Sequence, residues 1–306
     1  MQRSKLSILL ATLAAPALVL ACGGHGTAET LMVSTSWLAS HWKDSNVVIL
    51  AIGAKADYDA GHIPGSQYLE YTEVAVKGEN GLSAELPPMG KLGEVFAKYG
   101  VSNDSRVVIY RLKDTLTQAA RVLVTLDAMG LGKNTSMLDG NLATWTGEGR
   151  PATTEVPVVK AGKLEPCAQS DVITDLEFVK SNLHQSGVRI LDARAPGIWS
   201  GTDARPGMPA GHIQGAGNVY FNDLVDDASG KFKSADEMQQ RFRAAGVKAG
   251  DRVVTYCFIG QQASALYFAS RYLGYDTRLY DGSWEEWTKH PELPTETAAP
   301  GSAEKK

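Results

Sequence analysis

The sequence predicts an α/β protein made of two similar domains, each a mostly parallel central sheet flanked by helices on both faces. Three observations support this prediction. The 306 residues suffice for two domains of ordinary size. Short runs rich in β-branched residues alternate with segments of helical spacing, which is typical of a parallel sheet covered by helices. Four sequence landmarks also occur twice, in the same order.

These landmarks define an internal repeat. Each copy contains an apolar strand, a Gly-His-Ile turn, a second strand, and an Asp-Gly pair followed by a Trp. In the first half they lie at residues 47–50, 61–66, 106–110 and 138–145, and in the second half at residues 188–191, 211–216, 252–256 and 280–287. The spacing between copies differs slightly from landmark to landmark, which indicates small insertions and deletions in the loops.

The repeat also sets the expected domain boundaries. We expect one domain at residues 31–150 and the other at residues 171–294. Residues 151–170 contain several prolines and little periodicity, so they are predicted to be a linker. Residues 295–306 contain Pro, Gly and terminal lysines and are predicted to be a disordered tail.

The composition of the chain argues against two classes of site, for nucleic acid and for metal. The chain has 30 Lys and Arg against 34 Asp and Glu, a formal charge of −4, whereas proteins that bind nucleic acid through phosphate contacts are usually basic. Three cysteines cannot build a disulfide scaffold, and no Cys/His cluster has the spacing of a zinc site. We therefore expect no nucleic-acid partner and no metal.

The N-terminus is typical of an export signal. Arg3 and Lys5 precede an apolar run at residues 6–21 that is too short to be a good spanning helix. The run ends in Ala21-Cys22, which resembles the bacterial lipobox. We expect residues 1–22 to be a signal peptide with lipidation at Cys22, which makes the protein a periplasmic or cell-envelope lipoprotein that touches the membrane only through its lipid. The alternative is ordinary secretion, with Cys22 removed or kept as a spare thiol.

Residues 23–30, after this signal, are predicted to be a short tether.

One cysteine, Cys257, lies where a predicted strand ends and a helix begins. Ligands of parallel sheets bind at the carboxyl ends of strands. A tight loop containing Gly260 can turn its N–H groups inward, and the next helix directs its positive end the same way. Such a cradle would lower a thiol pKa and hold an anion. The alternative interpretation is a buried core cysteine.

Several motifs resemble the rhodanese superfamily, in particular its tandem-domain sulfurtransferases. They are the two Gly-His-Ile turns, Leu-Asp-Ala-Arg at residues 191–194, the six-residue loop 257–262, and Tyr-Asp-Gly-Ser-Trp-Glu-Glu-Trp at residues 280–287. The resemblance implies an inactive first domain and a second domain whose Cys257 takes a sulfane sulfur from a donor such as thiosulfate. The persulfide then passes the sulfur to cyanide or a thiol, and no cofactor is needed.

The resemblance also implies a set of site residues. Substrate-binding residues are the loop residues Phe258, Ile259, Gly260, Gln261 and Gln262, together with Arg194 and Arg205, and supporting residues are Asp192 and Trp284. Asp192 and Arg194 are expected to form an ion pair that braces the loop. His62 and His212 are expected to be turn residues rather than bases. Cys167 is expected to be a free thiol, with a redox partnership with Cys257 as the alternative.

The sequence departs from the family pattern in the residues that meet the donor. Relatives that prefer thiosulfate carry basic residues after the cysteine and relatives that prefer mercaptopyruvate carry small ones, whereas this chain has Phe258 and Ile259. Ile198 stands where tandem relatives have an arginine. In the first half, Arg111 stands at the position of the cysteine and could lend charge to the cleft, or could be a solvated surface residue.

Three classes of function remain open. The first is a sulfurtransferase that uses thiosulfate or 3-mercaptopyruvate. The second is a non-catalytic module that carries or binds a persulfide. The third is a phosphatase, which needs an arginine six residues after the cysteine to clamp phosphate. That position is Ala263, so a phosphatase is not expected.

Overall fold

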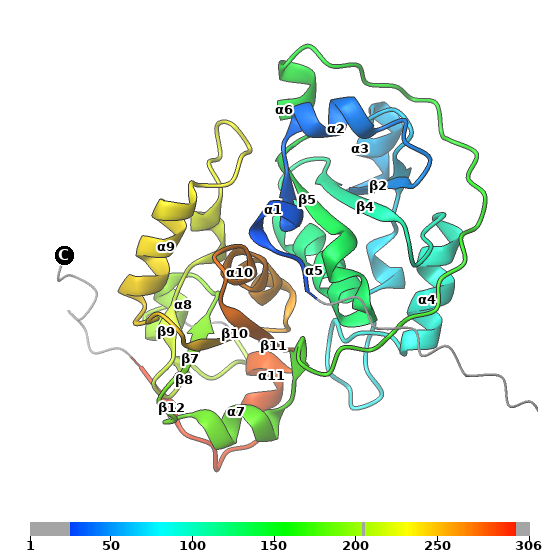
Figure 1. The fold of residues 1–306 in the computed structure, drawn as a ribbon. Helices are drawn as coiled ribbons and strands as arrows, with labels where there is room; N and C mark the ends of the chain where they lie inside the picture. The colour runs from blue at the N-terminus through cyan, green and yellow to red at the C-terminus, as the bar shows by residue number, and fades with distance from the viewer. Residues whose placement is uncertain (1–24, 204–205, 298–306) are drawn as a thin grey trace, which may run out of the picture.

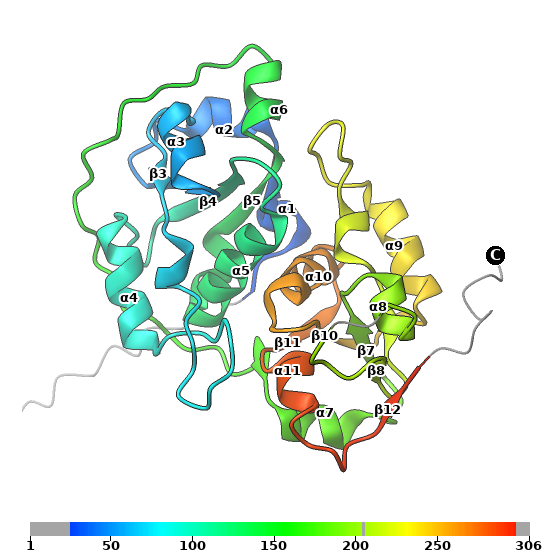
Figure 2. The same cartoon turned by 180° about the vertical axis from the view of Figure 1, so that it is seen from behind.

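The computed structural model describes residues 25–203 and 206–297, which form two α/β domains lying side by side (Figures 1 and 2). Each domain contains a five-stranded sheet in which all neighbouring strands are parallel. The strand orders are β1-β5-β4-β2-β3 and β6-β11-β10-β7-β9, so the two domains share one topology. The predicted fold class is confirmed.

The first domain contains the elements that precede the linker. Its strands are β1 (Met32–Val33), β2 (Val47–Ile52), β3 (Gln67–Tyr68), β4 (Arg106–Arg111) and β5 (Thr135–Asn141). Its helices are α1 (Ala28–Leu31), α2 (Thr35–His41), α3 (Lys55–Ala60), α4 (Met89–Lys98), α5 (Leu116–Leu126) and α6 (Leu142–Gly147), with short helical turns η1 (Tyr71–Glu73), η2 (Asp127–Leu131) and η3 (Gly132–Asn134).

The second domain repeats the order of the five sheet strands and adds the short strands β8 and β12. Its strands are β6 (Ile173–Thr174), β7 (Val188–Asp192), β8 (His212–Ile213), β9 (Gly217–Asn218), β10 (Arg252–Tyr256), β11 (Asp276–Tyr280) and β12 (Thr295–Glu296). Its helices are α7 (Leu176–Asn182), α8 (Pro196–Ser200), α9 (Ala235–Ala244), α10 (Gln261–Tyr272) and α11 (Ser283–Trp287), with the 3₁₀ turn η4 (Phe221–Leu224). Within the described ranges, no helix is long and apolar enough to cross a bilayer.

Equivalent contacts in the two domains show that the sequence repeat is a structural repeat. In the first domain the backbone N–H of Ile63 donates to the Tyr110 hydroxyl at 3.2 Å. In the second domain Ile213 donates to Tyr256 in the same way, at 3.1 Å. Tyr110 is the last residue but one of β4, and Tyr256 is the last residue of β10. Both are the middle strands of their sheets. The hydrogen bond therefore ties each Gly-His-Ile turn, which leads to the edge strand, to the middle of the sheet.

The two repeated histidines are structural, as predicted. His62 stacks on Tyr58 with ring centroids 3.8 Å apart, and its Nδ1 bonds to the Tyr58 carbonyl. His212 stacks on Trp199 at 4.4 Å and its Nδ1 bonds to the Trp199 carbonyl. Both imidazoles are buried. Each histidine therefore ties its turn to the helix before it.

The domains are joined by two helices that are buried nearly all round. Helix α5 buries every residue from 119 to 126, and α10 buries every residue from 263 to 270. A helix that is buried on all sides lies inside a core rather than on a surface. The two helices pack against each other at the centre of the molecule (Figures 1 and 2). One apolar cluster consequently extends through both domains.

The linker at residues 151–170 follows the outside of the first domain (Figure 1). Thr153 exchanges two backbone hydrogen bonds with His62, each 2.9 Å long. Further along, the N–H of Gly162 donates to the Ala97 carbonyl at 2.8 Å. The linker is thus fixed along one domain by backbone hydrogen bonds.

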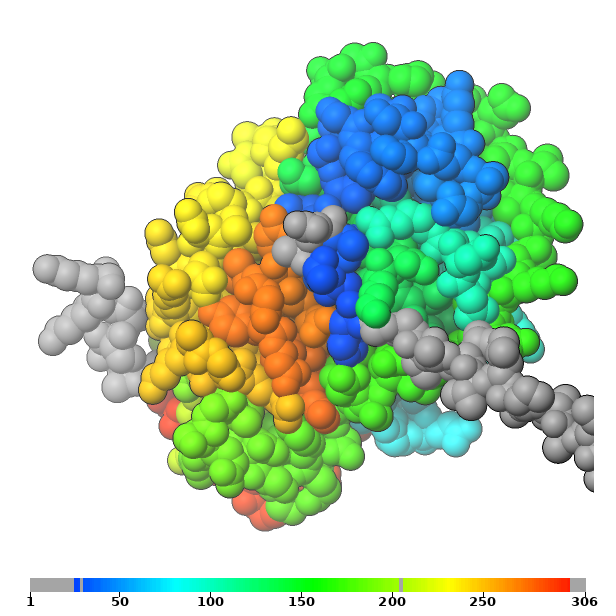
Figure 3. Space-filling view, in the orientation of Figure 1, coloured from blue at the N-terminus to red at the C-terminus, as the bar shows by residue number. Residues whose placement is uncertain are grey.

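The predicted tether is ordered in its second half. Residues 28–31 form α1, and Leu31 is fully buried. His25 bonds through Nδ1 to Asp127 at 2.8 Å and through Nε2 to Asp171 at 3.0 Å. In Figure 3 the blue N-terminal segment lies between the orange α10 and the green first domain. The tether prediction is therefore wrong for residues 25–30, because side chains after the Gly-Gly pair find partners between the domains.

The predicted tail also begins too early. Residues 295–296 form β12, which pairs antiparallel with β8. The Glu296 carboxylate accepts hydrogen bonds from His212 at 3.2 Å and from the N–H of Gly215 at 2.7 Å. Ordered structure therefore extends past the predicted boundary at residue 294. Residues 298–306 lie outside the described residues.

Candidate active site

Cys257 lies directly after β10, the middle strand of its sheet, and before α10. The N–H groups of Ile259, Gln262 and Ala263 donate to its sulfur. Gly260 makes this turn possible, because its φ is +78° and an added Cβ would lie 2.5 Å from an Asp281 carboxylate oxygen. The predicted backbone cradle is present.

The loop is held in shape by Ser283. Its hydroxyl accepts hydrogen bonds from the N–H groups of Cys257 at 3.2 Å and Gly260 at 3.0 Å, and donates to the Tyr280 carbonyl at 2.8 Å. The N–H of Trp284 donates to the Cys257 carbonyl at 3.0 Å. The motif at residues 280–287 therefore braces the cradle, and Ser283 is a supporting residue that the sequence analysis did not single out.

The thiol itself is fully buried. Burial raises the pKa of Cys257 above its usual value, the three N–H groups act to lower it, and the nearby charge of Asp192 acts to raise it. The expected lowering of this pKa is wrong, because loss of water outweighs the backbone dipoles.

Asp192 and Arg194 form a buried ion pair beside the loop. Arg194 Nη2 donates to Asp192 Oδ2 at 2.6 Å, and Nε lies 3.0 Å from both carboxylate oxygens. Nη2 also donates to the Gly211 carbonyl at 2.8 Å. The guanidinium packs over Trp284 at 4.6 Å and Phe258 at 5.0 Å. It is 1 % exposed, so its charge acts from behind the loop rather than from an open cleft.

The remaining predicted site residues have mixed placements. Gln261 donates through Nε2 to the Thr117 hydroxyl of the first domain at 3.0 Å. Gln262 buries its Oε1 without a hydrogen-bond partner within the described part of the chain. Trp284 is fully buried and donates to the Pro209 carbonyl at 3.2 Å, so it belongs to the core wall. Arg205 and Cys22 lie outside the described residues.

A buried interdomain ion pair was missed by the sequence analysis. Arg121 of α5 binds both carboxylate oxygens of Asp281 and donates to the Ala84 carbonyl at 2.6 Å. Nearby, Ser83 donates through its N–H and hydroxyl to Glu285, at 2.8 and 3.1 Å. These contacts hold the first-domain loop around residues 83–84 against the segment at residues 280–287, which in turn supports the catalytic loop. Nothing in a single sequence links residues so far apart.

Two sequence expectations about individual side chains are corrected. Arg111 is not a solvated surface residue: it is 2 % exposed and donates to the carbonyls of Gly230 and Gly140. Cys167 is not a free thiol, because it is disulfide-bonded. Cys257 is free, so it is not the redox partner of Cys167.

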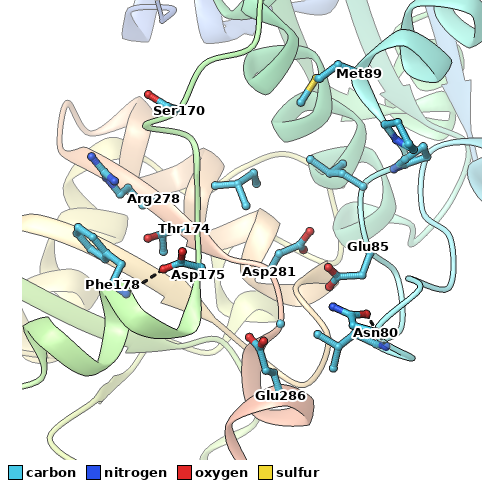
Figure 4. Close-up of a pocket in the computed structure, with 16 residues that line it drawn as sticks. Asn80, Glu85, Met89, Ser170, Thr174, Asp175, Phe178, Arg278, Asp281 and Glu286 are labelled. Atoms are coloured by element: carbon cyan, nitrogen blue, oxygen red, sulfur yellow. Dashed lines mark hydrogen bonds between the residues drawn. The ribbon is translucent and has the colours of Figure 1, made fainter.

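Two pockets lie between the domains near this site. The larger, about 640 Å³, is shown in Figure 4. Its lining contains four carboxylates, from Glu85, Asp175, Asp281 and Glu286, and one guanidinium, from Arg278. Burial raises the pKa of Glu85 to about 7, with the charges of Asp281 and Glu286 adding to the effect. An acidic pocket of this kind does not suit an anionic sulfur donor.

The fold and the site together define a class of protein: two α/β repeats in which the second sheet presents a buried thiol in a cradle of N–H groups. The model of the rhodanese-like domain matches residues 34–148 and 175–290. The chain therefore belongs to the rhodanese-like family, with two copies of the domain.

Curated relatives extend over nearly the whole chain. The sulfur carrier protein TtuD of Thermus thermophilus is 31 % identical over 283 residues, covering 86 % of this chain and 95 % of the relative. The thiosulfate sulfurtransferase of Rattus norvegicus is 29 % identical, covering 89 % and 96 %. The 3-mercaptopyruvate sulfurtransferase of Escherichia coli K12 is 27 % identical, covering 87 % and 98 %.

Proposed function

We propose that the protein is a sulfurtransferase that moves a sulfane sulfur from a donor such as thiosulfate to cyanide or a thiol, through a persulfide on Cys257. One observation carries this proposal. Cys257 is a free thiol at the carboxyl end of a central strand, and three backbone N–H groups donate to its sulfur. Thiosulfate and 3-mercaptopyruvate are the donors named for the relatives.

The reaction consists of two displacements at sulfur. The Cys257 thiolate attacks the outer sulfur of thiosulfate, the S–S bond of the donor breaks, and sulfite leaves with the electron pair. The acceptor then attacks the outer sulfur of the persulfide, and Cys257 leaves as a thiolate. The N–H groups of Ile259, Gln262 and Ala263 stabilise negative charge on the sulfur in both half-reactions.

Replacement of the nucleophile tests this function directly. We expect Cys257→Ser to abolish thiocyanate formation from thiosulfate and cyanide while leaving the circular dichroism spectrum unchanged, because the hydroxyl is a far weaker nucleophile. Cys167→Ser is the control and should keep the wild-type turnover under reducing conditions, in which the disulfide of Cys167 is open in the wild type too. Retention of more than about a tenth of the activity in Cys257→Ser would show that another group carries the sulfur. The same assay with 3-mercaptopyruvate decides between the two donors.

The second candidate is a sulfur carrier that holds the persulfide for a partner. Two observations favour it: one relative is named as a sulfur carrier protein, and the Cys257 sulfur is shielded from water. A carrier would become loaded with one sulfur per chain but would turn over slowly with cyanide. Mass spectrometry of the loaded protein, followed by multiple-turnover kinetics, separates a carrier from an enzyme.

We further propose that the protein is exported and anchored to the cell envelope by a lipid on Cys22. The basic start, the short apolar run and the Ala-Cys pair support this proposal. Mass spectrometry of the mature N-terminus is the test: a diacylglyceryl group on Cys22 is expected. An unmodified Cys22, or a chain that begins after it, would contradict the lipid anchor.

A further inference from the structure

A second pocket between the domains, about 420 Å³ in volume, is linked to the catalytic loop through Thr117, a lining residue that binds Gln261. We call it the Arg111 pocket. Its lining includes Arg111, Asp114 and Thr117 from the first domain and Phe221, Val225 and Asp227 from the second. The Thr117 hydroxyl accepts the hydrogen bond from Gln261 at 3.0 Å. The N–H of Phe221 donates to the Ala193 carbonyl at 3.1 Å, at the end of β7. Both domains thus position this pocket beside the loop that holds Cys257.

Arg111 gives the pocket a buried cation. Its side chain makes no ion pair within the described part of the chain, and its Nε has no hydrogen-bond partner there. Burial lowers the pKa of Arg111 to about 10, with the more distant charges of Asp114 and Asp139 opposing, so it stays charged at neutral pH. Burying an unpaired cation is unfavourable, and an anionic group of a ligand would offset that cost.

The lining of the pocket also carries negative charge. Asp114 and Asp227 are exposed, whereas Leu116, Phe221 and Val225 supply an apolar wall. A simple anion in this pocket would be attracted by Arg111 but repelled by two carboxylates. A ligand with a carboxylate at one end and an ammonium nearby would satisfy both signs of charge. The pocket volume lies within the range of small-molecule sites.

We propose that the Arg111 pocket binds the sulfur acceptor, and that this acceptor is a zwitterionic amino-acid thiol. Its carboxylate pairs with Arg111, its ammonium pairs with Asp114 and Asp227, and its thiol is directed to the loop. This inference rests on the proposed sulfurtransferase function. The acceptor thiol releases its proton to water, and its thiolate attacks the outer sulfur of the Cys257 persulfide. The S–S bond to Cys257 breaks, Cys257 leaves as a thiolate, and the acceptor becomes a persulfide.

Acceptor selectivity tests the proposal. The full chain, loaded with sulfur from thiosulfate, is offered cysteine, 3-mercaptopropionate, which lacks the ammonium, and cysteamine, which lacks the carboxylate. We expect wild type to favour cysteine. In Arg111→Gln, kcat/KM should fall about 10- to 100-fold for cysteine and 3-mercaptopropionate and much less for cysteamine, because a buried charge-assisted hydrogen bond is lost. In Asp227→Asn the loss, about 2- to 5-fold, should affect only cysteine and cysteamine.

Lys113→Gln is the matched control. It removes one positive charge two residues from Arg111, at a side chain that is 70 % exposed and outside the pocket lining, and it should leave all three acceptors unchanged. An equal loss for all three acceptors in Arg111→Gln, or no preference for cysteine in wild type, overturns the proposal. If Arg111→Gln does not fold, the proposal is tested by Asp227→Asn, which changes an exposed side chain. A loss for cysteine and cysteamine but not for 3-mercaptopropionate then supports the proposal, and any other pattern overturns it. Failure of wild type to gain one sulfur from thiosulfate would instead contradict the proposed function.

Discussion

The Cys257 thiol combines two opposing influences at the scale of one residue. Three N–H groups favour its thiolate, and complete burial favours its neutral form. The position of the cysteine between strand and helix, together with Gly260, was enough to predict the cradle. The direction of the pKa shift was not predictable, because it depends on how completely the rest of the protein excludes water from the loop. The net effect is a raised pKa.

Alkylation of Cys257 should therefore depend on alkaline pH. The thiolate is the reactive form, so the iodoacetamide rate constant should keep rising through the ordinary thiol pKa of about 8.5 and level off above it. Cys257→Ser provides the background for labelling of other thiols. A rate constant that is already constant below about pH 8 would mean that the N–H groups outweigh burial after all.

The Asp192–Arg194 pair should contribute to stability mainly because both partners are buried. Asp192→Asn leaves the guanidinium without its counter-charge, and we expect the free energy of unfolding in urea to fall by about 3–5 kcal/mol. Glu94→Gln is the control, because it breaks a pair whose carboxylate side chain is 70 % exposed, and such pairs contribute about 1 kcal/mol or less. Similar losses in both variants would show that Asp192 is not a structural anchor of the loop.

At the scale of elements, the loop 257–262 depends on the segment that follows β11. Ser283 holds two of its N–H groups, and the backbone of α11 holds two of its carbonyls. The motif at residues 280–287 is recognisable in the sequence as a family signature, but its role in holding the loop depends on contacts between residues more than 20 positions apart. The absence of charged side chains between Cys257 and Gln262 is read directly from the sequence, which has Phe258 and Ile259 there.

A cation placed in this loop should change the choice of donor. Ile259→Lys should lower the KM for thiosulfate, a dianion, more than for mercaptopyruvate, because the gain is coulombic. Ile259→Met is the matched control for side-chain length without charge. The ratio of kcat/KM for the two donors is measured at two salt concentrations, and salt should reduce the gain. A ratio that stays unchanged, or a gain that salt does not affect, would show that the charge of the loop does not select the donor.

At the scale of the whole molecule, the repeat predicted two sheets of one topology, and the two halves share their strand order and their Gly-His-Ile contacts. The joining of the halves was not predictable. The ion pair of Arg121 with Asp281 and the bridge of His25 to two aspartates connect residues more than 100 positions apart. A single sequence carries periodicity and local motifs, but it carries no signal for such pairings.

The His25 bridge should make the stability of the molecule depend on pH. The hydrogen bond to Asp127 is the largest cause of a raised His25 pKa, burial opposes it, and Asp171 adds to it. Protonated His25 thus favours the folded state. This stabilisation is complete below the unfolded pKa of about 6.5 and is lost as pH rises through the higher folded pKa.

The difference in Tm between wild type and His25→Gln should therefore be largest near about pH 6 and shrink as the pH rises through the folded pKa. His184→Gln, at an exposed position, is the control for losing a histidine elsewhere. Because Asp127 belongs to the first domain and Asp171 to the start of the second, the lost stability should appear as weaker coupling of the domains. Calorimetry should then show one cooperative transition at low pH and a broader one at high pH. A Tm difference that is constant across this range would contradict a charged bridge.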